Sequence, residues 1–215
     1  MRSYKQYCAI AKALDVVGDR WNLLIVRELL LQRACRYTDL QNGLPGIATN
    51  LLAERLRELE REGIVAREEA PPPIAATLFR LTPRGQQLDA TLFELGRWGA
   101  PLMTEPDEHD AFRGHWLAFP ISFLVSDRTP DQPPVTIELR TGGDTITVET
   151  GDGKVHTHLG AAEKPDLILT GPPQPLLGVL TGQVNLTTAR DRGVQAQGNA
   201  EILSRFRPEP AGTET

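Results

Sequence analysis

Polar side chains that could read DNA recur at helical spacing between residues 50 and 61. Asn50, Glu54, Arg57 and Arg61 share one side of a helix at about 100° per residue. The opposite side holds Leu52, Leu56 and Leu59. An asparagine can make paired hydrogen bonds to adenine, and an arginine can neutralise a backbone phosphate. The same pattern also fits an ordinary solvated helix stabilised by Glu54–Arg57 and Glu58–Arg61 pairs. The neighbouring elements must therefore distinguish a DNA-reading helix from a solvated one.

The elements around this segment are predicted to be helices and one hairpin. Apolar periodicity predicts helices over residues 9–17, 20–31, 38–42, 48–62 and 83–103. Asp19 is placed to cap the second helix, and Gly63 to end the fourth. Residues 64–67 and 77–81 flank a proline-rich turn and predict a β-hairpin. This order is that of a winged helix-turn-helix, whose recognition helix enters the major groove. Its hairpin, the wing, can reach the flanking backbone or the minor groove.

Charge is divided unevenly along the chain. The 215 residues carry a net charge of -5, but residues 1–100 hold 14 basic and 12 acidic residues, whereas residues 101–215 hold 9 and 16. Phosphate binding needs only a local basic surface, so the acidic total does not exclude DNA binding. The contrast indicates two domains of different character.

Cysteine content and hydropathy exclude several classes of protein. Cys8 and Cys35 are the only cysteines, too few for a disulfide-stapled scaffold. The most apolar stretch, residues 116–125, is interrupted by Pro120 and is shorter than the roughly 18 residues of a membrane span. The sequence shows no signal peptide, so we expect a cytoplasmic protein without membrane contacts.

Residues 8–103 resemble the HxlR-type winged-helix transcriptional regulators of bacteria. The resemblance is carried by Cys8 and by residues 13–21, 24–29, 37–40, 44–47, 52–60, 63–65 and 81–85. It implies a homodimer on a pseudo-palindromic double-stranded DNA operator. It also implies dimer contacts through the first helix and the helix after the wing.

The expected DNA contacts take account of two departures from the family pattern. Ala48 stands where the family usually has a polar cap residue. A capping hydrogen bond is therefore lost unless Thr49 or Asn50 supplies it. The wing tip, residues 71–76, is apolar instead of basic, so phosphate contacts are expected from the base of the wing. The residues that we expect to contact DNA are Thr38, Thr49, Asn50, Arg57, Arg67 and Arg80.

Two further residues of the family pattern suggest roles other than base reading. Arg55 lies beside the leucine side of its helix, and we expect it to pair internally with a carboxylate such as Asp39 or Glu28 rather than to contact DNA. Cys8 aligns with the cysteine through which some family members sense oxidants or electrophiles. Such sensing needs an exposed, partly ionised thiol, and an inert cysteine in a dimer helix is the alternative.

The second half of the sequence predicts an α+β domain with an antiparallel meander sheet. Strands are predicted at residues 135–141, 145–150, 154–159, 166–170 and 194–197. Helices are predicted at residues 174–180, 184–192 and 199–206. His156 and His158 would share a strand face, but no third metal ligand is evident, and a solvated sheet face is the better interpretation. The half contains no catalytic motif, so we expect no enzyme, metal or cofactor.

Residues 132–206 are similar to sterol-carrier-protein domains. The similarity is carried by residues 166–171, 176–182 and 189–193, with Gly198 and Leu203 following. It implies a sheet and helices around an apolar tunnel for a small hydrophobic ligand, although a packed core is the alternative. The expected ligand-binding residues are Trp116, Phe119, Phe123, Leu176, Leu177 and Leu180.

Together these features predict a two-domain transcriptional regulator. The expected organisation is a winged helix-turn-helix DNA-binding and dimerisation domain (1–104), a linker (105–111), a sterol-carrier-like domain (112–207) and a disordered tail (208–215). The first domain would bind the operator, and a hydrophobic ligand in the second would modulate it. The alternative is a thiol switch at Cys8, with a second domain that is only structural or a lipid-binding module.

Overall fold

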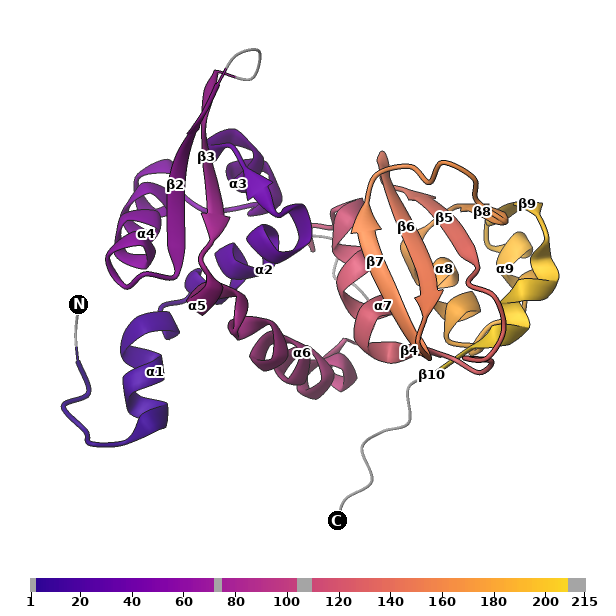
Figure 1. Cartoon of the computed structure of the whole chain (residues 1–215), viewed down its shortest axis with the longest axis horizontal. Helices are drawn as coiled ribbons and strands as arrows, with labels where there is room; N and C mark the ends of the chain where they lie inside the picture. The colour runs from indigo at the N-terminus through magenta and orange to yellow at the C-terminus, as the bar shows by residue number, and fades with distance from the viewer. Residues whose placement is uncertain (1–2, 72–74, 104–109, 209–215) are drawn as a thin grey trace. The chain divides into compact units, whose positions relative to one another are not determined.

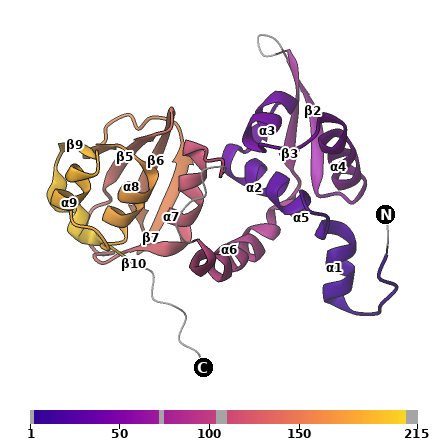
Figure 2. The same ribbon diagram turned by 180° about the vertical axis from the view of Figure 1, so that it is seen from behind.

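The computed structural model of the chain describes residues 3–71, 75–103 and 110–208. The chain divides into two compact units, Met1–Leu95 and Gly96–Thr215 (Figures 1 and 2). The tip of the predicted wing at residues 72–74, most of the predicted linker and nearly all of the predicted tail lie outside the described residues.

Four helices build most of the first unit: α1 (Ala9–Val17), α2 (Asn22–Gln32), α3 (Tyr37–Gly43) and α4 (Thr49–Arg61). Each lies within about two residues of its predicted position. Much of the unit's buried apolar core comes from α2, α3 and α4. Its fully buried side chains include Ile25, Leu29, Leu40, Leu52, Leu56 and Leu59. Gly63, at a φ of +68°, follows α4 in a conformation that favours glycine.

The predicted wing is an antiparallel hairpin of β2 (Val65–Ala70) and β3 (Ala76–Leu81). The sequence did not predict the third strand, β1 (Ala34–Cys35), which pairs with the other edge of β3. A two-residue strand has no periodicity to detect. β1 lies directly before α3, so it ties the helix-turn-helix to the base of the wing.

The predicted helix over residues 83–103 is wrong as one continuous element. It is divided into α5 (Pro83–Gln86), α6 (Leu88–Gly99) and the 3₁₀ helix η1 (Ala100–Leu102). The first turn is fixed locally, because the Thr82 hydroxyl accepts a hydrogen bond from the Gly85 amide at 3.1 Å. Gly85 also lies so close to the Ile64 carbonyl that a Cβ would be 2.2 Å from its oxygen. At the other end Pro101 has no N–H to continue an α-helix.

The second unit contains a five-stranded sheet in the order β7–β6–β5–β8–β9. Its strands are β5 (Thr136–Thr141), β6 (Asp144–Gly151), β7 (Lys154–Leu159), β8 (Leu167–Thr170) and β9 (Gln195–Gly198). The prediction of an antiparallel meander holds for β5, β6 and β7 but is wrong for β8, which runs parallel to β5.

The connection between β7 and β8 explains this difference. After β7 the chain crosses the sheet and enters on the far side of β5. There Asp166 fixes the start of β8, because its amide donates to the Thr136 carbonyl and its carboxylate accepts from the Thr136 amide, both at 2.8 Å. Strand direction after such a crossover depends on tertiary pairing and not on local periodicity.

The sheet has one apolar and one polar face. Its apolar face includes Ile137, Leu139, Ile146, Val148, Leu167 and Leu169, all fully buried. Helix α8 (Pro173–Leu180) lies behind the sheet in Figure 1 and in front of it in Figure 2. Helix α7 (Ala118–Leu124) joins the same face, where the Thr157 hydroxyl donates to the Ala118 carbonyl at 3.1 Å.

The crossover segment covers part of the polar face. The Ala162 amide donates to the Glu138 carboxylate at 2.9 Å, and the Thr147 hydroxyl donates to the Gly160 carbonyl at 2.9 Å. Glu138 and Thr147 are therefore buried although both are polar.

A small two-stranded sheet closes the second unit, formed by β4 (Val125–Asp127) and β10 (Phe206–Pro208). The 3₁₀ helices η2 (Gly114–Leu117) and η3 (Ala200–Arg205) and the helix α9 (Leu186–Asp191) complete the unit. The sequence did not predict β4 or β10, and it predicted a helix at residues 199–206, where the structure has the 3₁₀ helix η3 followed by β10. A buried ion pair joins η3 to β4, because the Arg205 guanidinium donates to the Asp127 carboxylate at 2.8 Å.

Candidate nucleic-acid interface

Helix α4 separates its side chains into a buried and an exposed side. Leu52, Leu56 and Leu59 are buried in the core. Asn50 and Arg57 are exposed on the opposite side, and the described residues give neither side chain a hydrogen bond or ion pair. A solvated helix would use the intrahelical pairs Glu54–Arg57 and Glu58–Arg61. In the second pair the closest charged atoms are 3.8 Å apart.

Helix α3 fixes where α4 begins. The Tyr37 hydroxyl donates to the Thr49 carbonyl at 2.6 Å, and the Gln41 amide donates to the Thr49 hydroxyl at 2.9 Å. Ala48 is the N-cap residue, with no side-chain capping bond. Neither Thr49 nor Asn50 therefore replaces the missing cap. Thr38 and Thr49 are exposed, but the Thr49 hydroxyl is already bonded to α3.

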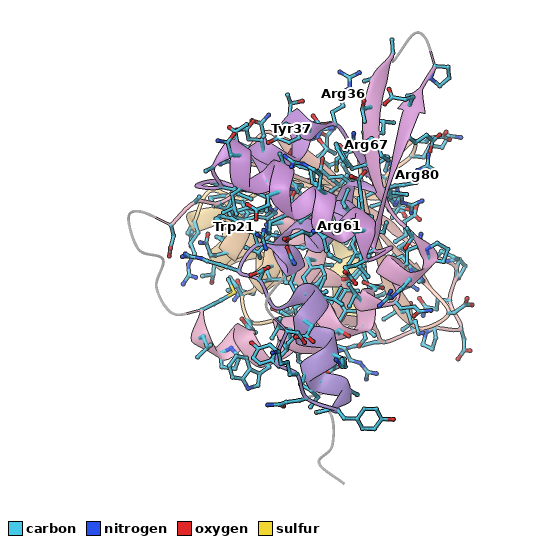
Figure 3. All side chains as sticks on the ribbon, turned by 90° about the vertical axis from the view of Figure 1, so that its left-hand side faces the viewer. Trp21, Arg36, Tyr37, Arg61, Arg67 and Arg80 are labelled. Atoms are coloured by element: carbon cyan, nitrogen blue, oxygen red, sulfur yellow. The ribbon has the colours of Figure 1, made fainter. Side chains whose placement is uncertain are left out.

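The two wing arginines are paired with carboxylates. Arg67 on β2 donates to the Glu60 carboxylate at 3.1 and 3.2 Å, and it lies 5.3 Å from the Phe79 ring centroid. Arg80 on β3 forms an ion pair with Glu68 on β2. Figure 3 shows both arginines on the wing, with Arg61 on α4. Exposed ion pairs are weak, so DNA phosphates can compete for these guanidinium groups.

Arg55 pairs internally, as predicted, but with different partners. Its guanidinium binds Asp19, Glu54 at 2.9 Å and Glu58 at 2.7 Å. The predicted partners are wrong, since Glu28 pairs with Arg27 at 2.7 Å and Asp39 accepts from the Arg36 amide at 2.8 Å. Asp19 consequently does not cap α2, whose N-cap residue is Trp21. No local signal could reveal a pair 36 residues apart.

The two cysteines lie in opposite environments. Cys8 is exposed at the N-cap of α1. Cys35 is fully buried, and its burial, reinforced by the negative charges of Glu28 and Asp39, raises its pKa to about 12. Only a thiolate is a good nucleophile, so Cys35 is inert near neutral pH.

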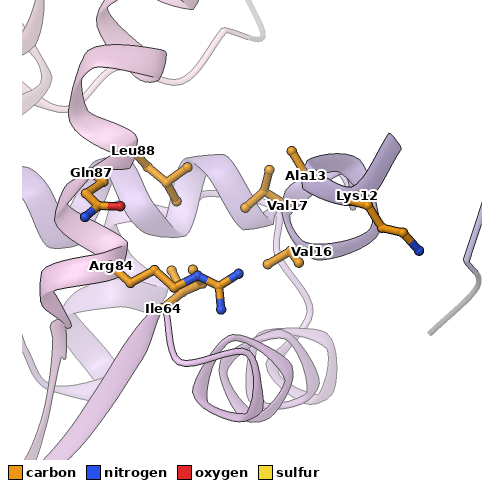
Figure 4. A pocket seen from close by; sticks show the side chains of 8 residues that line it. All are labelled: Lys12, Ala13, Val16, Val17, Ile64, Arg84, Gln87 and Leu88. Atoms are coloured by element: carbon orange, nitrogen blue, oxygen red, sulfur yellow. The ribbon is translucent and has the colours of Figure 1, made fainter. Parts of the chain in front are cut away.

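The first unit also contains a groove of about 260 Å³ beside α1 (Figure 4). Its apolar lining comes from Ala13, Val16, Val17, Ile64 and Leu88, and its polar lining from Lys12, Arg84 and Gln87. The Arg84 guanidinium is held beside it by a 2.8 Å hydrogen bond to the Glu62 carbonyl. The groove therefore joins the first helix to the helices that follow the wing.

Apolar side chains remain exposed on these same helices. Ile10 is 72% exposed and Leu14 42% exposed on α1, while Leu95 is 45% exposed and Trp98 72% exposed on α6. Tyr7, just before α1, is fully exposed. Exposed large apolar side chains of this kind can take part in an interface with a partner.

The predicted ligand-binding residues of the second unit lie on η2, α7 and α8. Phe123, Leu176 and Leu180 are buried, whereas Trp116, Phe119 and Leu177 are half-buried. The rings of Phe119 and Phe123 pack edge to face with centroids 5.5 Å apart. Trp116 packs instead against Phe112 and His115.

The histidines of β7 are not part of a group of three potential metal ligands within the described part of the chain. His156 is exposed and His158 half-buried. Residues 3–71, 75–103 and 110–208 contain no group of three or more potential metal-ligating side chains. Within the same ranges, no helix has the length and apolar character needed to cross a bilayer.

Comparison with known proteins assigns the first unit. The family model for the HxlR-like helix-turn-helix matches residues 16–107. The HTH-type transcriptional regulator YvaP of Bacillus subtilis, described as uncharacterized, is 37% identical over 87 residues, which are 40% of this chain and 80% of YvaP. The regulator YodB of the same organism is 34% identical over 96 residues, 45% of this chain and 84% of YodB.

Among solved structures, the reduced form of YodB is 31% identical and covers 47% of this chain and all of that one, with a TM-score of 0.40. The identity to YvaP extends over most of that protein, and the matched residues 16–107 contain α2, α3, α4 and the wing. Through this winged helix-turn-helix unit, the chain belongs to the HxlR-like helix-turn-helix family of DNA-binding transcriptional regulators.

Proposed function

We propose that the chain binds a pseudo-palindromic operator as a homodimer, with α4 as the recognition helix. The observation that carries this proposal is the exposed side of α4, where Asn50 and Arg57 have no partner within the described residues. Asn50 lies in the first turn, the part of a recognition helix that meets bases. Arg57 is about two turns further along the helix, where a guanidinium can reach a phosphate. Thr38, Thr49, Arg67 and Arg80 would add contacts at the edges.

The dimer would form through α1 and α6. Support comes from the apolar side chains that α1 and α6 each leave exposed and from the groove beside α1, which a second copy of the chain could cover. Two recognition helices related by a two-fold axis would then meet half-sites about one helical turn of DNA apart. Duplexes selected from a random pool should show two such half-sites, and light scattering should give a dimer. A monomer at micromolar concentration, or a single unrepeated site, would contradict this.

We further propose that the second unit is a sterol-carrier-like module for a small hydrophobic ligand. Support comes from the sheet, whose apolar face is covered by α7 and α8. The aromatic and leucine side chains proposed for binding on these two helices are buried or half-buried. The acidic composition of this half disfavours contact with DNA phosphates. A ligand that favours one dimer state by about 1–3 kcal/mol would suffice to regulate binding.

Ligand binding can be tested without knowing the ligand. Mass spectrometry of small molecules released from the purified protein should identify an apolar compound. Leu177→Trp, which enlarges a half-buried side chain on α8, should abolish its retention and leave operator binding intact. Retention by Leu177→Trp at the wild-type level would show that the cluster around Leu177 is not the binding site.

The alternative regulator is the Cys8 thiol, favoured by its exposure. An electrophile at pH 8 should label Cys8 and leave Cys35 unreacted, because the pKa of Cys35 is about 12. If the thiol regulates, labelling should change operator affinity in the wild type and not in Cys8→Ser. Equal affinity of labelled and unlabelled wild-type protein would remove the thiol switch.

A further inference from the structure

Glu54 occupies the middle of the exposed side of α4. Along the helix it lies between Asn50 and Arg57, and at about 100° per residue it falls within about 60° of Asn50, Arg57 and Arg61 around the helix. Its side chain is 56% exposed. An unmatched carboxylate there would face the phosphates of any bound duplex and weaken binding through like-charge repulsion. The Arg55 guanidinium offsets part of this charge, and a hydrogen-bond donor on the DNA would match the exposed remainder of the carboxylate.

The carboxylate of Glu54 is also held in place. Arg55 binds it through Nη2 at 2.9 Å, while its Nη1 binds Glu58 at 2.7 Å and Asp19. The Arg55 side chain is only 12% exposed. Asp19 lies just beyond the end of α1, so Arg55 links the connection between α1 and α2 to the exposed side of the recognition helix. A side chain braced in this way is better suited to reading a base than a freely rotating one.

The chemistry of the major groove selects the base. Exocyclic amines of cytosine and adenine are the donors displayed there, and adenine places its N7 acceptor beside the amine. A carboxylate only accepts hydrogen bonds, so N7 would repel it, whereas cytosine presents N4–H₂ for it to accept. We propose that Glu54 reads a cytosine in each operator half-site and that Arg55 is its positioning residue. This inference rests on the proposed role of α4 as the recognition helix.

Replacement of Glu54 by glutamine tests the base directly. Glutamine accepts and donates, so it matches the N6 and N7 pair of adenine. With an operator selected by the wild type, and with every single-base substitution of it, Glu54→Gln should change the preferred base at one position per half-site from cytosine to adenine. The expected change in relative affinity for the two bases is about tenfold or more. A switch of preference cannot arise from a misfolded variant.

Glu60→Gln is the matched control, because it removes one carboxylate from the same helix at a position paired with Arg67 instead of Arg55. It should leave every base preference unchanged. Asp19→Asn tests the positioning role, since it removes one anchor of Arg55 without touching the exposed side of α4. It should weaken the cytosine preference and leave the preference at the Asn50 position intact, whereas a purely structural loss would lower affinity for all duplexes alike.

The outcomes separate this inference from the proposed function. If Asn50→Ala relaxes one base preference and Glu54→Gln changes none, Glu54 does not read a base and the recognition helix stands. If Glu54→Gln switches the base and Asp19→Asn changes no preference, the positioning role of Arg55 is wrong. If Asn50, Arg57 and Glu54 variants all bind every duplex as the wild type does, α4 is not the recognition helix and both proposals fail.

Discussion

Arg57 on α4 and Arg205 at the closing corner of the second unit have the same guanidinium in opposite surroundings. Arg57 is exposed and has no partner within the described residues. Arg205 is 7% exposed and donates to Asp127, to the Pro133 and Thr129 carbonyls and to the Thr150 hydroxyl. Since buried polar groups must be satisfied, the second arginine is committed to stability, and the first remains available for a ligand.

The same contrast distinguishes the polar surfaces of the two units. The exposed side of α4 is uncovered, whereas the polar face of the second sheet is partly covered by the crossover segment that bonds to Glu138 and Thr147. Amphipathic patterns thus have different consequences, depending on whether the chain itself satisfies the polar side. A row of polar residues in sequence is evidence for binding only when the fold leaves it open.

The strongest test of this comparison is a pair of matched arginine substitutions. Arg205→Met should destabilise the second unit by about 3–5 kcal/mol, because it leaves the Asp127 carboxylate buried and unpaired. Arg57→Met should change stability by no more than about 0.5 kcal/mol, as expected for an exposed position. Hydrogen exchange of the β4–β10 amides and of the first-unit core would measure both. Equal protection of β4–β10 in Arg205→Met and wild type would refute the structural role.

Acid should produce a smaller effect through the same ion pair. Burial of Asp127 raises its pKa, but the hydrogen bonds from Arg205 and Thr129 outweigh burial and hold the pKa below its usual value. A lowered folded pKa contributes stability above the unfolded aspartate pKa of about 3.9, and this is lost as pH falls through the folded pKa. Protection of β4–β10 should therefore decrease below about pH 4 in the wild type. Asp127→Asn, measured as the control, should lack this component.

The smallest expected effect concerns the wing, whose arginines are intermediate in burial and pairing between Arg57 and Arg205. Its arginines are exposed but paired, so removing the carboxylate of Glu68 should release Arg80 for phosphate. Glu68→Gln should tighten DNA binding by about twofold to fivefold, the range of an exposed ion pair. Glu69→Gln removes an equal charge from the adjacent residue, which bonds to Thr77 instead of an arginine. If both variants tighten binding equally, only total charge matters and the pairing of Arg80 has no role.

The sequence predicted the elements that periodicity defines. The four helices, the wing hairpin and the strands β5, β6 and β7 lie near their predicted positions, because most of them carry a recurring apolar pattern. The short strands β1, β4 and β10 were missed because two or three residues contain no repeat. The parallel pairing of β8 was missed because strand order is decided by contacts far apart in the chain.

The features of the candidate interface were likewise predictable only where helical periodicity defines them. Helical spacing was enough to separate Asn50 and Arg57 from the buried leucines. It could not show that Arg67 and Arg80 are paired, nor that Asp19 binds Arg55 instead of capping α2, because these partners depend on how the wing and helices pack. The predicted contacts at Thr38, Thr49, Arg67 and Arg80 remain predictions.

The central claim, that the exposed side of α4 reads the operator, is tested most directly by comparing Asn50→Ala with Arg57→Ala on one selected operator and its single-base variants over a range of salt concentrations. Asn50→Ala should relax preference at one base pair per half-site, at a cost of about 1–3 kcal/mol. Arg57→Ala should weaken binding to all duplexes and reduce the salt dependence by about one released counterion for each arginine removed. Wild-type affinity, base preference and salt dependence in both variants would contradict the account.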